Sequence, residues 1–385
     1  MSIANQAKAA VCLGILTSVA VTAQTNSLAS SAKTTSSPVA YVYVQSSSGV
    51  VAYSAASNGQ LTKISGSPFN TTGSITGSTG SIFFTTGTDY IHSYPVASNG
   101  AIKAQESEIN SQKYSGASCG PAGAPGVLDH SGKYFYMFLD NSMSCGAYQT
   151  YTIGKNGVLT FNNWTDVPQE SGGYMTAPTI LGNEAFAYAI SGYAHNANLI
   201  GFARESSGAL QAIKLNETDP SGPSGITWTP TLVDGDPTNH LAVALDPYDS
   251  NPPQLASYTV DSHGNIVSTN TAEDMPTLPF AATELAFSPS GTLLAVAGGY
   301  PTGYGAGNGL EVFHFNGAKP ITAYSGLMAN MEIDGIKWDS SNHLYAISTK
   351  TNQLLVYTVT ATSITKAPGS PYTITDPTVL ITKSL

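Results

Sequence analysis

His195 is the residue whose type and position best suit acid–base chemistry. It stands in the segment Ser191-Gly-Tyr-Ala-His-Asn196, a polar stretch between two apolar runs. A neutral imidazole can take a proton from water, and a nearby carboxylate can orient the ring. Asp140, Asp246 and Asp249 follow other apolar runs and could be that partner. His195 is therefore a candidate catalytic residue, the alternative being a solvated loop histidine.

Glu284 is the second candidate catalytic residue. It lies directly before the apolar run Leu285-Ala-Phe287 and is expected to face a central channel, where a carboxylate could exchange protons. The alternative is that channel water simply solvates it. The chain has no Gly-x-Ser-x-Gly elbow, phosphate loop or dinucleotide fingerprint in the required strand–turn–helix context. No cofactor is expected.

Several tyrosines lie on polar, glycine-containing segments and are candidates for binding. Aromatic rings on such loops can stack on a sugar or a peptide. The alternative is that they pack the loops against the rest of the fold. The candidate binding residues are Tyr193, Tyr248, Asp249, Tyr300 and Tyr304.

The other histidines do not form a predicted metal site. His130, His240 and His343 recur at equivalent turns of different repeat units, which favours a structural role. The segment from Asp234 to Asn239 resembles part of a calcium loop but lacks the bidentate glutamate that an EF-hand requires. Cysteine, histidine and carboxylate spacing gives no zinc pattern.

A repeat must position these residues. A strand with an aromatic residue recurs every 41 to 57 residues, and in five copies a glycine follows the aromatic residue by six positions. Asn-Gly pairs in these turns accept positive φ at both central positions of a tight hairpin. Repeats of this length are typical of four-stranded propeller blades. The repeated aromatic residues are Tyr53, Tyr94, Tyr151, Phe202, Tyr258, Phe313 and Tyr357.

Seven aromatic strands predict seven blades over residues 39–385. Two further strands precede most aromatic strands, as in Leu285–Phe287 followed by Leu293–Ala297. The first unit lacks an innermost strand, and the spare C-terminal strand Val379–Thr382 is expected to supply it. Pairing of this kind closes the ring and removes exposed sheet edges. The predicted fold is an all-β, seven-bladed β-propeller with four antiparallel strands per blade.

The repeat resembles the lactonase family of seven-bladed propellers, which contains 6-phosphogluconolactonase-like proteins. The likeness rests on Leu285-Ala-Phe-Ser-Pro-Ser-Gly291, on Val127–Gly132 and on the aromatic and Asn-Gly repeats. It also rests on Ser65-Gly-Ser-Pro-Phe69 with its echo Pro368-Gly-Ser-Pro-Tyr372. The resemblance implies that the protein is a lactone hydrolase. Arg204 is the single arginine and Lys337 the one lysine expected in an inner strand, so an unphosphorylated lactone or related ester is the expected substrate.

Long segments are expected to gather on one face of the ring, because loops leading into blades and loops between second and third strands share a face. That face is the predicted site, and the tight hairpins lie opposite. Cys119 and Cys145 belong to two such loops of the third blade, so a disulfide between them is expected, the alternative being two free thiols.

The first 23 residues have the features of a signal peptide. Lys8 precedes a short apolar run that ends in small residues, with Val21 and Ala23 at cleavage-site positions. A retained anchor is the alternative. Residues 24–38 are rich in Ser, Thr and Ala and are predicted to be a flexible linker. The protein is expected to be secreted or periplasmic, with no membrane span in the mature chain.

The amino-acid composition limits the classes of molecule that the protein can be expected to bind. Only 10% of the 385 residues are charged, and the net charge is −10. Nucleic acid is not among the expected partners because phosphate contacts need clustered cations. The expected partners are a small-molecule lactone, a glycan or a surface protein, and the chain is expected to be a monomer. Two functions stay open: lactone hydrolysis, or non-catalytic recognition of a glycan or protein through the tyrosine-rich face.

Overall fold

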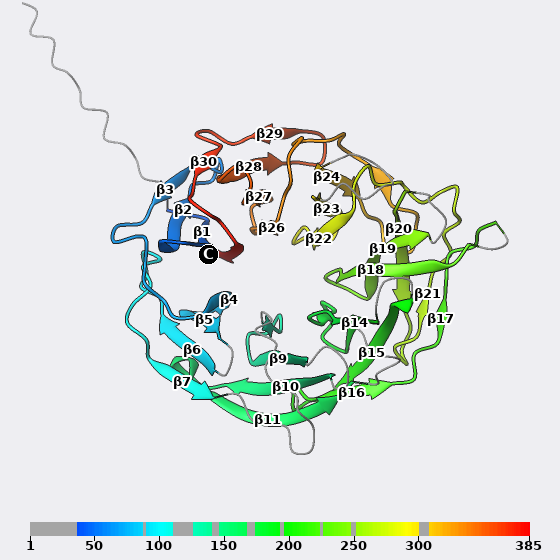
Figure 1. Ribbon diagram of the computed structural model, residues 1–385, viewed down its shortest axis with the longest axis horizontal. Helices are drawn as coiled ribbons and strands as arrows, with labels where there is room; N and C mark the ends of the chain where they lie inside the picture. The colour runs from blue at the N-terminus through cyan, green and yellow to red at the C-terminus, as the bar shows by residue number, and fades with distance from the viewer. Residues whose placement is uncertain are drawn as a thin grey trace, which may run out of the picture. The chain divides into compact units, whose positions relative to one another are not determined.

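The computed structural model describes residues 37–87, 90–110, 126–140, 146–167, 174–192, 196–223, 226–247, 252–299 and 308–385. Within these residues, seven separate sheets follow one another around a ring, and their strands pair antiparallel except for the short β17 in blade 5, which pairs parallel with β21 (Figure 1). No α-helix occurs in these ranges. No helical segment there is long and apolar enough to cross a membrane. The predicted seven-bladed β-propeller is confirmed.

Each blade runs from an innermost strand at the ring centre to an outer strand. Blade 1 contains β31 (Val379–Ser384), β1 (Ala40–Ser46), β2 (Gly49–Ala55) and β3 (Leu61–Lys63). Blade 2 contains β4 (Ser74–Thr79), β5 (Ile82–Thr86), β6 (Tyr90–Pro95) and β7 (Ser107–Asn110). Blade 3 contains β8 (Val127–Leu128), β9 (Tyr134–Asp140), β10 (Gly146–Ile153) and β11 (Leu159–Asp166), with a 3-10 turn, η1 (Lys155–Gly157), between the last two.

In the rest of the ring, blades 4, 5 and 7 contain a fifth strand and blade 6 has four. Blade 4 contains β12 (Tyr174–Met175), β13 (Thr179–Ile180), β14 (Phe186–Gly192), β15 (Asn198–Arg204) and β16 (Leu210–Ile213). Blade 5 contains β18 (Trp228–Gly235), β19 (His240–Pro247), β20 (Gln254–Val260), β21 (Ile266–Val267) and β17 (Glu217–Thr218). Blade 6 contains β22 (Ala282–Phe287), β23 (Leu293–Gly298), β24 (Gly309–His314) and β25 (Thr322–Ala323). Blade 7 contains β26 (Gly335–Trp338), β27 (His343–Ser348), β28 (Gln353–Val359), β29 (Ile364–Lys366) and β30 (Tyr372–Thr373).

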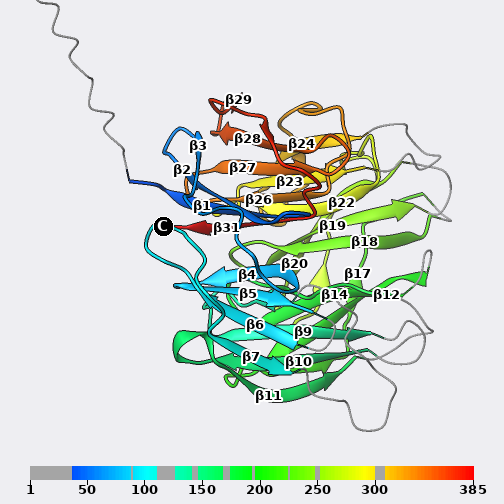
Figure 2. The ribbon, with the colours of Figure 1, turned by 60° about the vertical axis from the view of Figure 1, so that its left-hand side comes forward.

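The C-terminal strand closes the ring as expected. β31 pairs antiparallel with β1 from Ala40–Ser384 to Gln45–Val379, and the two strands lie side by side in Figure 2. Leu380 pairs with Val44 and is buried. The last strand in the sequence is therefore the innermost strand of the first blade.

The core lies between blades rather than within them. Seven clusters of buried side chains occur in the described part of the chain, and each joins two neighbouring blades. All seven repeated aromatic residues are buried in the third strands of their blades. Each sheet thus buries both faces, which explains why the central strands read as apolar runs rather than as strict alternation.

Hairpin glycines bring neighbouring blades together. Gly208 has φ +82, and its carbonyl accepts a 2.8 Å hydrogen bond from the Tyr136 hydroxyl of the preceding blade. A Cβ at this position would lie 2.3 Å from the Tyr134 ring. The repeated glycine is required both by the turn and by the close approach of the next blade.

One expectation about these turns is wrong. Asn156 and Gly157 both have positive φ, but at Asn58-Gly59 and Asn99-Gly100 only the glycine does. At Gly59 the amide donates to the Ala56 carbonyl, and the Ala56 amide donates to Gln60. The turn is therefore one residue longer than a two-residue hairpin, and its asparagine remains in ordinary backbone space.

Candidate active site

The innermost strands line a central cavity of about 800 Å³. Every blade contributes to its wall, so residues far apart in sequence face one space. The contributing residues include Ile75, Leu128, Thr179, Asp234, Glu284, Lys337 and Leu380, one from each blade. A ligand in this cavity would contact the whole ring.

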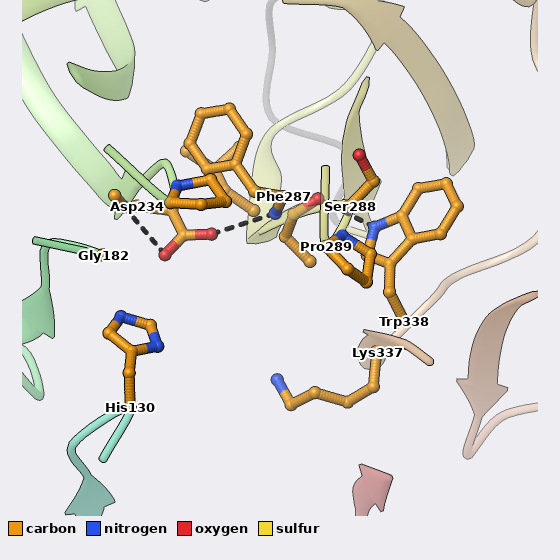
Figure 3. Close-up of a pocket in the computed structure, with 12 residues that line it drawn as sticks. His130, Gly182, Asp234, Phe287, Ser288, Pro289, Lys337 and Trp338 are labelled. Atoms are coloured by element: carbon orange, nitrogen blue, oxygen red, sulfur yellow. Dashed lines mark hydrogen bonds between the residues drawn. The ribbon is translucent and has the colours of Figure 1, made fainter. Parts of the chain in front are cut away.

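A second cavity of about 610 Å³ shares several of these residues. It lies at the end of the ring formed by the turns between first and second strands, which contribute Gly182, Pro237 and Ser288; we call this the turn end. His130, Asp234 and Lys337 border both cavities and surround one open space in Figure 3. Three titratable side chains from three blades therefore border one cavity at the turn end.

Lys337 is paired with Glu284 of the neighbouring blade. The Lys337 ammonium donates to Oε1 of Glu284, and the Ile336 amide donates to Oε2 over 2.6 Å. The Lys337 side chain keeps 40% of its surface exposed. Burial by itself lowers the pKa of Lys337, but the charge and hydrogen bond of Glu284 and the charge of Asp234 together raise it. Lys337 is thus held as a cation.

Asp234 is the last residue but one of β18 and accepts three hydrogen bonds. Thr179 Oγ1 and the Gly235 amide donate to Oδ1 over 3.0 Å each, and the Phe287 amide donates to Oδ2 over 3.1 Å. Burial raises the pKa of Asp234 to about 6, although these bonds and the Lys337 charge oppose the shift. A carboxylate with such a pKa can both accept and return a proton near neutral pH.

His130 presents one ring nitrogen for chemistry. Its Nε2 lies 2.7 Å from the carbonyl oxygen of Ile180, so Nε2 carries the hydrogen and donates. In the neutral ring, Nδ1 is then an acceptor, and it has no hydrogen-bond partner among the described residues. His130 follows β8, in the turn where the sequence analysis placed it. It also borders the cavity, although the sequence analysis assigned it only a structural role.

The sequence-based candidates divide into two groups. Glu284 lies in the described part of the chain and borders the central cavity, where it pairs with Lys337. The remaining candidates lie outside the described residues, so their roles and the proposed disulfide stay predictions. These residues are Tyr193, His195, Tyr248, Asp249, Tyr300, Tyr304, Cys119 and Cys145.

Sequence reasoning missed the role of Asp234. Its resemblance to a calcium loop drew attention to the segment, but its carboxylate oxygens bond to protein donors. No group of three or more potential metal ligands occurs in the described ranges. The feature that could have identified Asp234 is its position in the repeat. Asp234, Glu284 and Lys337 all lie on the first strands of consecutive blades.

Comparisons with known proteins support the fold alone. No family model matches the chain, and no curated protein matches it either. A Bacteroides uniformis structure whose proposed activity is that of a 6-phosphogluconolactonase is similar over 89% of this chain and 99% of its own, with TM-score 0.65 and 12% identity. The Pseudomonas aeruginosa periplasmic gluconolactonase is similar over 89% of this chain and 98% of its own, with TM-score 0.62 and 14% identity. The chain therefore shares the seven-bladed fold of gluconolactonase-like propellers, and the predicted resemblance is confirmed at the level of fold.

Proposed function

We propose that the protein hydrolyses a lactone or related ester at the turn end of its central cavity. This end lies on the hairpin side of the ring, opposite the long-loop face on which the sequence analysis expected the site. The observation that carries this proposal is the meeting of a fixed cation, Lys337, with a carboxylate of raised pKa, Asp234, in one cavity. The shared fold with gluconolactonase-like propellers supports the reaction class.

Each residue has a role that its environment suits. Asp234 removes a proton from water while the water oxygen forms a bond to the lactone carbonyl carbon. Lys337 stabilises the negative charge that develops on the carbonyl oxygen. When the ring C–O bond breaks, the leaving alkoxide takes the proton back from Asp234. Glu284 acts as a positioning residue because it holds the Lys337 ammonium in place.

We further propose that the substrate is unphosphorylated. Among the described residues that border the two cavities, Lys337 is the only lysine or arginine, against the carboxylates of Asp234, Glu284 and Asp334. Arg204 does not border either cavity and instead forms ion pairs with Asp129 and Glu184. A phosphate group would meet a predominantly negative wall with one cation already paired.

Location and the alternative function also remain proposals. An extracytoplasmic location agrees with the apolar N-terminal segment and with the periplasmic gluconolactonase that shares the fold. Recognition of a glycan or protein through the tyrosine-rich loops is the alternative. Loss of turnover on changing a cavity residue would separate hydrolysis from recognition.

The test is turnover of a panel of unphosphorylated γ- and δ-lactones, followed by acid release. Wild type is expected to hydrolyse at least one member, and Lys337→Met is expected to lose on the order of 10²-fold in kcat, as when an oxyanion donor is removed. Lys63→Met, an exposed lysine on β3, is the matched control and should retain wild-type turnover. Absent wild-type turnover, or equal turnover in Lys337→Met, would contradict the proposal.

A further inference from the structure

The outer edges of the third strands show a repeated pattern. In six blades, the residue three positions before the repeated aromatic residue has a backbone partner on its outer side. In each case a later part of the same chain covers the edge. The pairs are Val50 with Phe69, Ile91 with Ile109, Tyr148 with Thr165, Leu255 with Pro276, Leu310 with Met328, and Leu354 with Tyr372.

Blade 4 departs from this pattern. The equivalent residue is Leu199, which pairs with Ile190 of β14 on its inner side. The outer ladder between β15 and β16 ends at the pair Gly201–Ile213. Among the described residues, Leu199 has no backbone partner on its outer side. In the part of the chain that the structure describes, this edge of β15 is therefore uncovered.

The cause lies in the path of the chain after β16. Instead of folding back over β15, it crosses to the next blade, where β17 pairs parallel with β21. The Ile266 amide donates to Asn216 and the Ser268 amide to Thr218, over 3.1 and 2.9 Å. The segment that would cover blade 4 thus covers blade 5.

The uncovered edge opens into a groove of about 400 Å³. We call it the blade-4 groove and define it by Leu199, Ile200, Gly201, Ile213, Leu215 and Glu217. A cavity of about 150 Å³ can hold a benzene ring, so the groove has room for an aromatic side chain and part of a backbone. Its walls combine apolar side chains with an unpaired strand edge.

We propose that the blade-4 groove binds an extended peptide, which adds to β15 as an antiparallel strand. Unpaired N–H and C=O groups of a strand edge are satisfied by an added strand, and side-chain pockets beside the edge supply selectivity. The fold itself indicates the sequence that fits. The equivalent edges of blades 1 and 7 are covered by Gly66-Ser-Pro-Phe69 and Gly369-Ser-Pro-Tyr372, with the aromatic residue antiparallel to Val50 or Leu354.

Charge adds a second requirement. Glu217 borders the groove and hydrogen-bonds to the carboxyl of Asp219. Burial, followed by repulsion from Asp219, raises the pKa of Glu217 well above its ordinary value. The pair of carboxyls shares a proton and keeps a negative charge beside the groove, where Lys214 is the one basic residue among the described lining residues. A peptide that carries a lysine or arginine as well as an aromatic residue would complement this charge.

A peptide with the sequence of residues 63–70, Lys-Ile-Ser-Gly-Ser-Pro-Phe-Asn, has both features and is the probe. Its fluorescein-labelled form is titrated with the full chain, and anisotropy is recorded. Saturable binding is expected. Two altered peptides, one with alanine for phenylalanine and one N-methylated at the phenylalanine amide, are each expected to bind on the order of tenfold more weakly.

Protein variants complete the experiment. Glu217→Arg is expected to weaken binding on the order of tenfold, whereas Glu106→Arg makes the same charge change at an exposed site in blade 2 and should have no effect. Absence of saturable binding would overturn the proposal, as would binding unchanged by N-methylation and by Glu217→Arg. A dimer in sedimentation experiments that Glu217→Arg dissociates would assign the groove to a second copy instead, and would also overturn it.

Discussion

At the scale of single residues, neighbours rather than solvent set the charges in the central cavity. Glu284 keeps Lys337 positive in a place where burial alone would lower its pKa. Burial of Asp234 raises its pKa toward the range in which proton transfer to and from water is efficient. The two groups are therefore complementary: one stabilises negative charge, and the other carries the proton.

The pKa of Asp234 predicts the acid side of the pH–rate profile. Because the ionised carboxylate is the base, kcat/KM for a lactone substrate is expected to fall about tenfold per pH unit below about 6. Asp234→Asn should remove most turnover and, with it, this limb of the profile. A profile that stays flat down to pH 4 would show that another group is the base.

The same shift predicts a stability difference that needs no substrate. The folded pKa of about 6 lies above the ordinary 3.8, so the protonated form favours folding. That stabilisation is full below the ordinary value and is lost as the pH rises through about 6. Thermal melts should therefore show wild type losing stability relative to Asp234→Asn between pH 4 and pH 7. Parallel curves would contradict the raised pKa.

Arg204 has a different role, because its guanidinium joins two blades. It donates to Asp129 over 2.6 Å, to Glu184 over 3.1 Å and to the Tyr136 hydroxyl over 2.9 Å, and the Asp129 side chain is fully buried. Arg204→Met is expected to destabilise the protein by roughly 3–5 kcal/mol, since it leaves a buried carboxylate without its cation. Urea denaturation measures the loss.

The double variant Asp129→Asn/Arg204→Met is the control for that prediction. Neutralising the carboxylate removes the uncompensated charge, so part of the lost stability should return. If the double variant is less stable than Arg204→Met alone, the ion pair is not the reason for the loss.

Site residues were only partly predictable at this scale. Glu284 could be assigned to the cavity because it lies on an inner strand with a clear apolar pattern. The role of Asp234 depends on three donors, two of which, from Thr179 and Phe287, belong to other segments of the chain. Spacing within one strand cannot reveal such long-range contacts.

At the scale of elements, the hairpin between β15 and β16 shows why glycine recurs. Gly208 combines a positive φ with the close approach of Tyr134 from the preceding blade. The turn conformation and the packing between blades 3 and 4 therefore both require glycine at this position. The apolar and turn patterns were enough to predict these hairpins, but the identity of the turn was not, because Asn58 and Asn99 take ordinary φ values while Asn156 does not.

A pair of glycine variants separates the two constraints. Gly208→Ala should cost about 1–2 kcal/mol for the left-handed backbone and about 1–3 kcal/mol more for the clash with Tyr134. Gly80→Ala has the backbone cost alone, because φ there is +52 and nothing lies within 4 Å of the added Cβ. Chemical denaturation should rank Gly208→Ala as the less stable. Equal losses of stability would mean that Tyr134 of the preceding blade moves aside without cost.

At the scale of the whole molecule, stability depends on closing the ring. Leu380 of β31 is buried in the cluster between blades 7 and 1, whereas Leu385 is 57% exposed. Leu380→Asp is expected to destabilise the protein by more than about 3 kcal/mol, since it buries an unpaired carboxylate in that cluster. Leu385→Asp, the matched control, should melt like wild type. Equal melting temperatures for both variants would contradict closure by β31.

The ring was the most predictable property because it depends on a repeated local pattern. Seven copies of an aromatic strand, each followed by a turn, give seven equivalent interfaces between neighbouring blades. Each interface buries a cluster of apolar side chains. The path of β17 into blade 5 breaks the repeat and could not be predicted in the same way. Its two residues pair with a strand of another unit, and no periodicity marks them.

The central claim is that the cavity performs ester chemistry on a substrate without phosphate. Its most direct test is the kcat/KM of the wild-type protein for glucono-δ-lactone and for its 6-phosphorylated form, measured side by side at neutral pH. The paired Lys337 and the carboxylates around it, among the described cavity residues, predict faster turnover of the unphosphorylated lactone, by at least about tenfold. Preference for the phosphorylated form, or turnover of neither, would contradict the account.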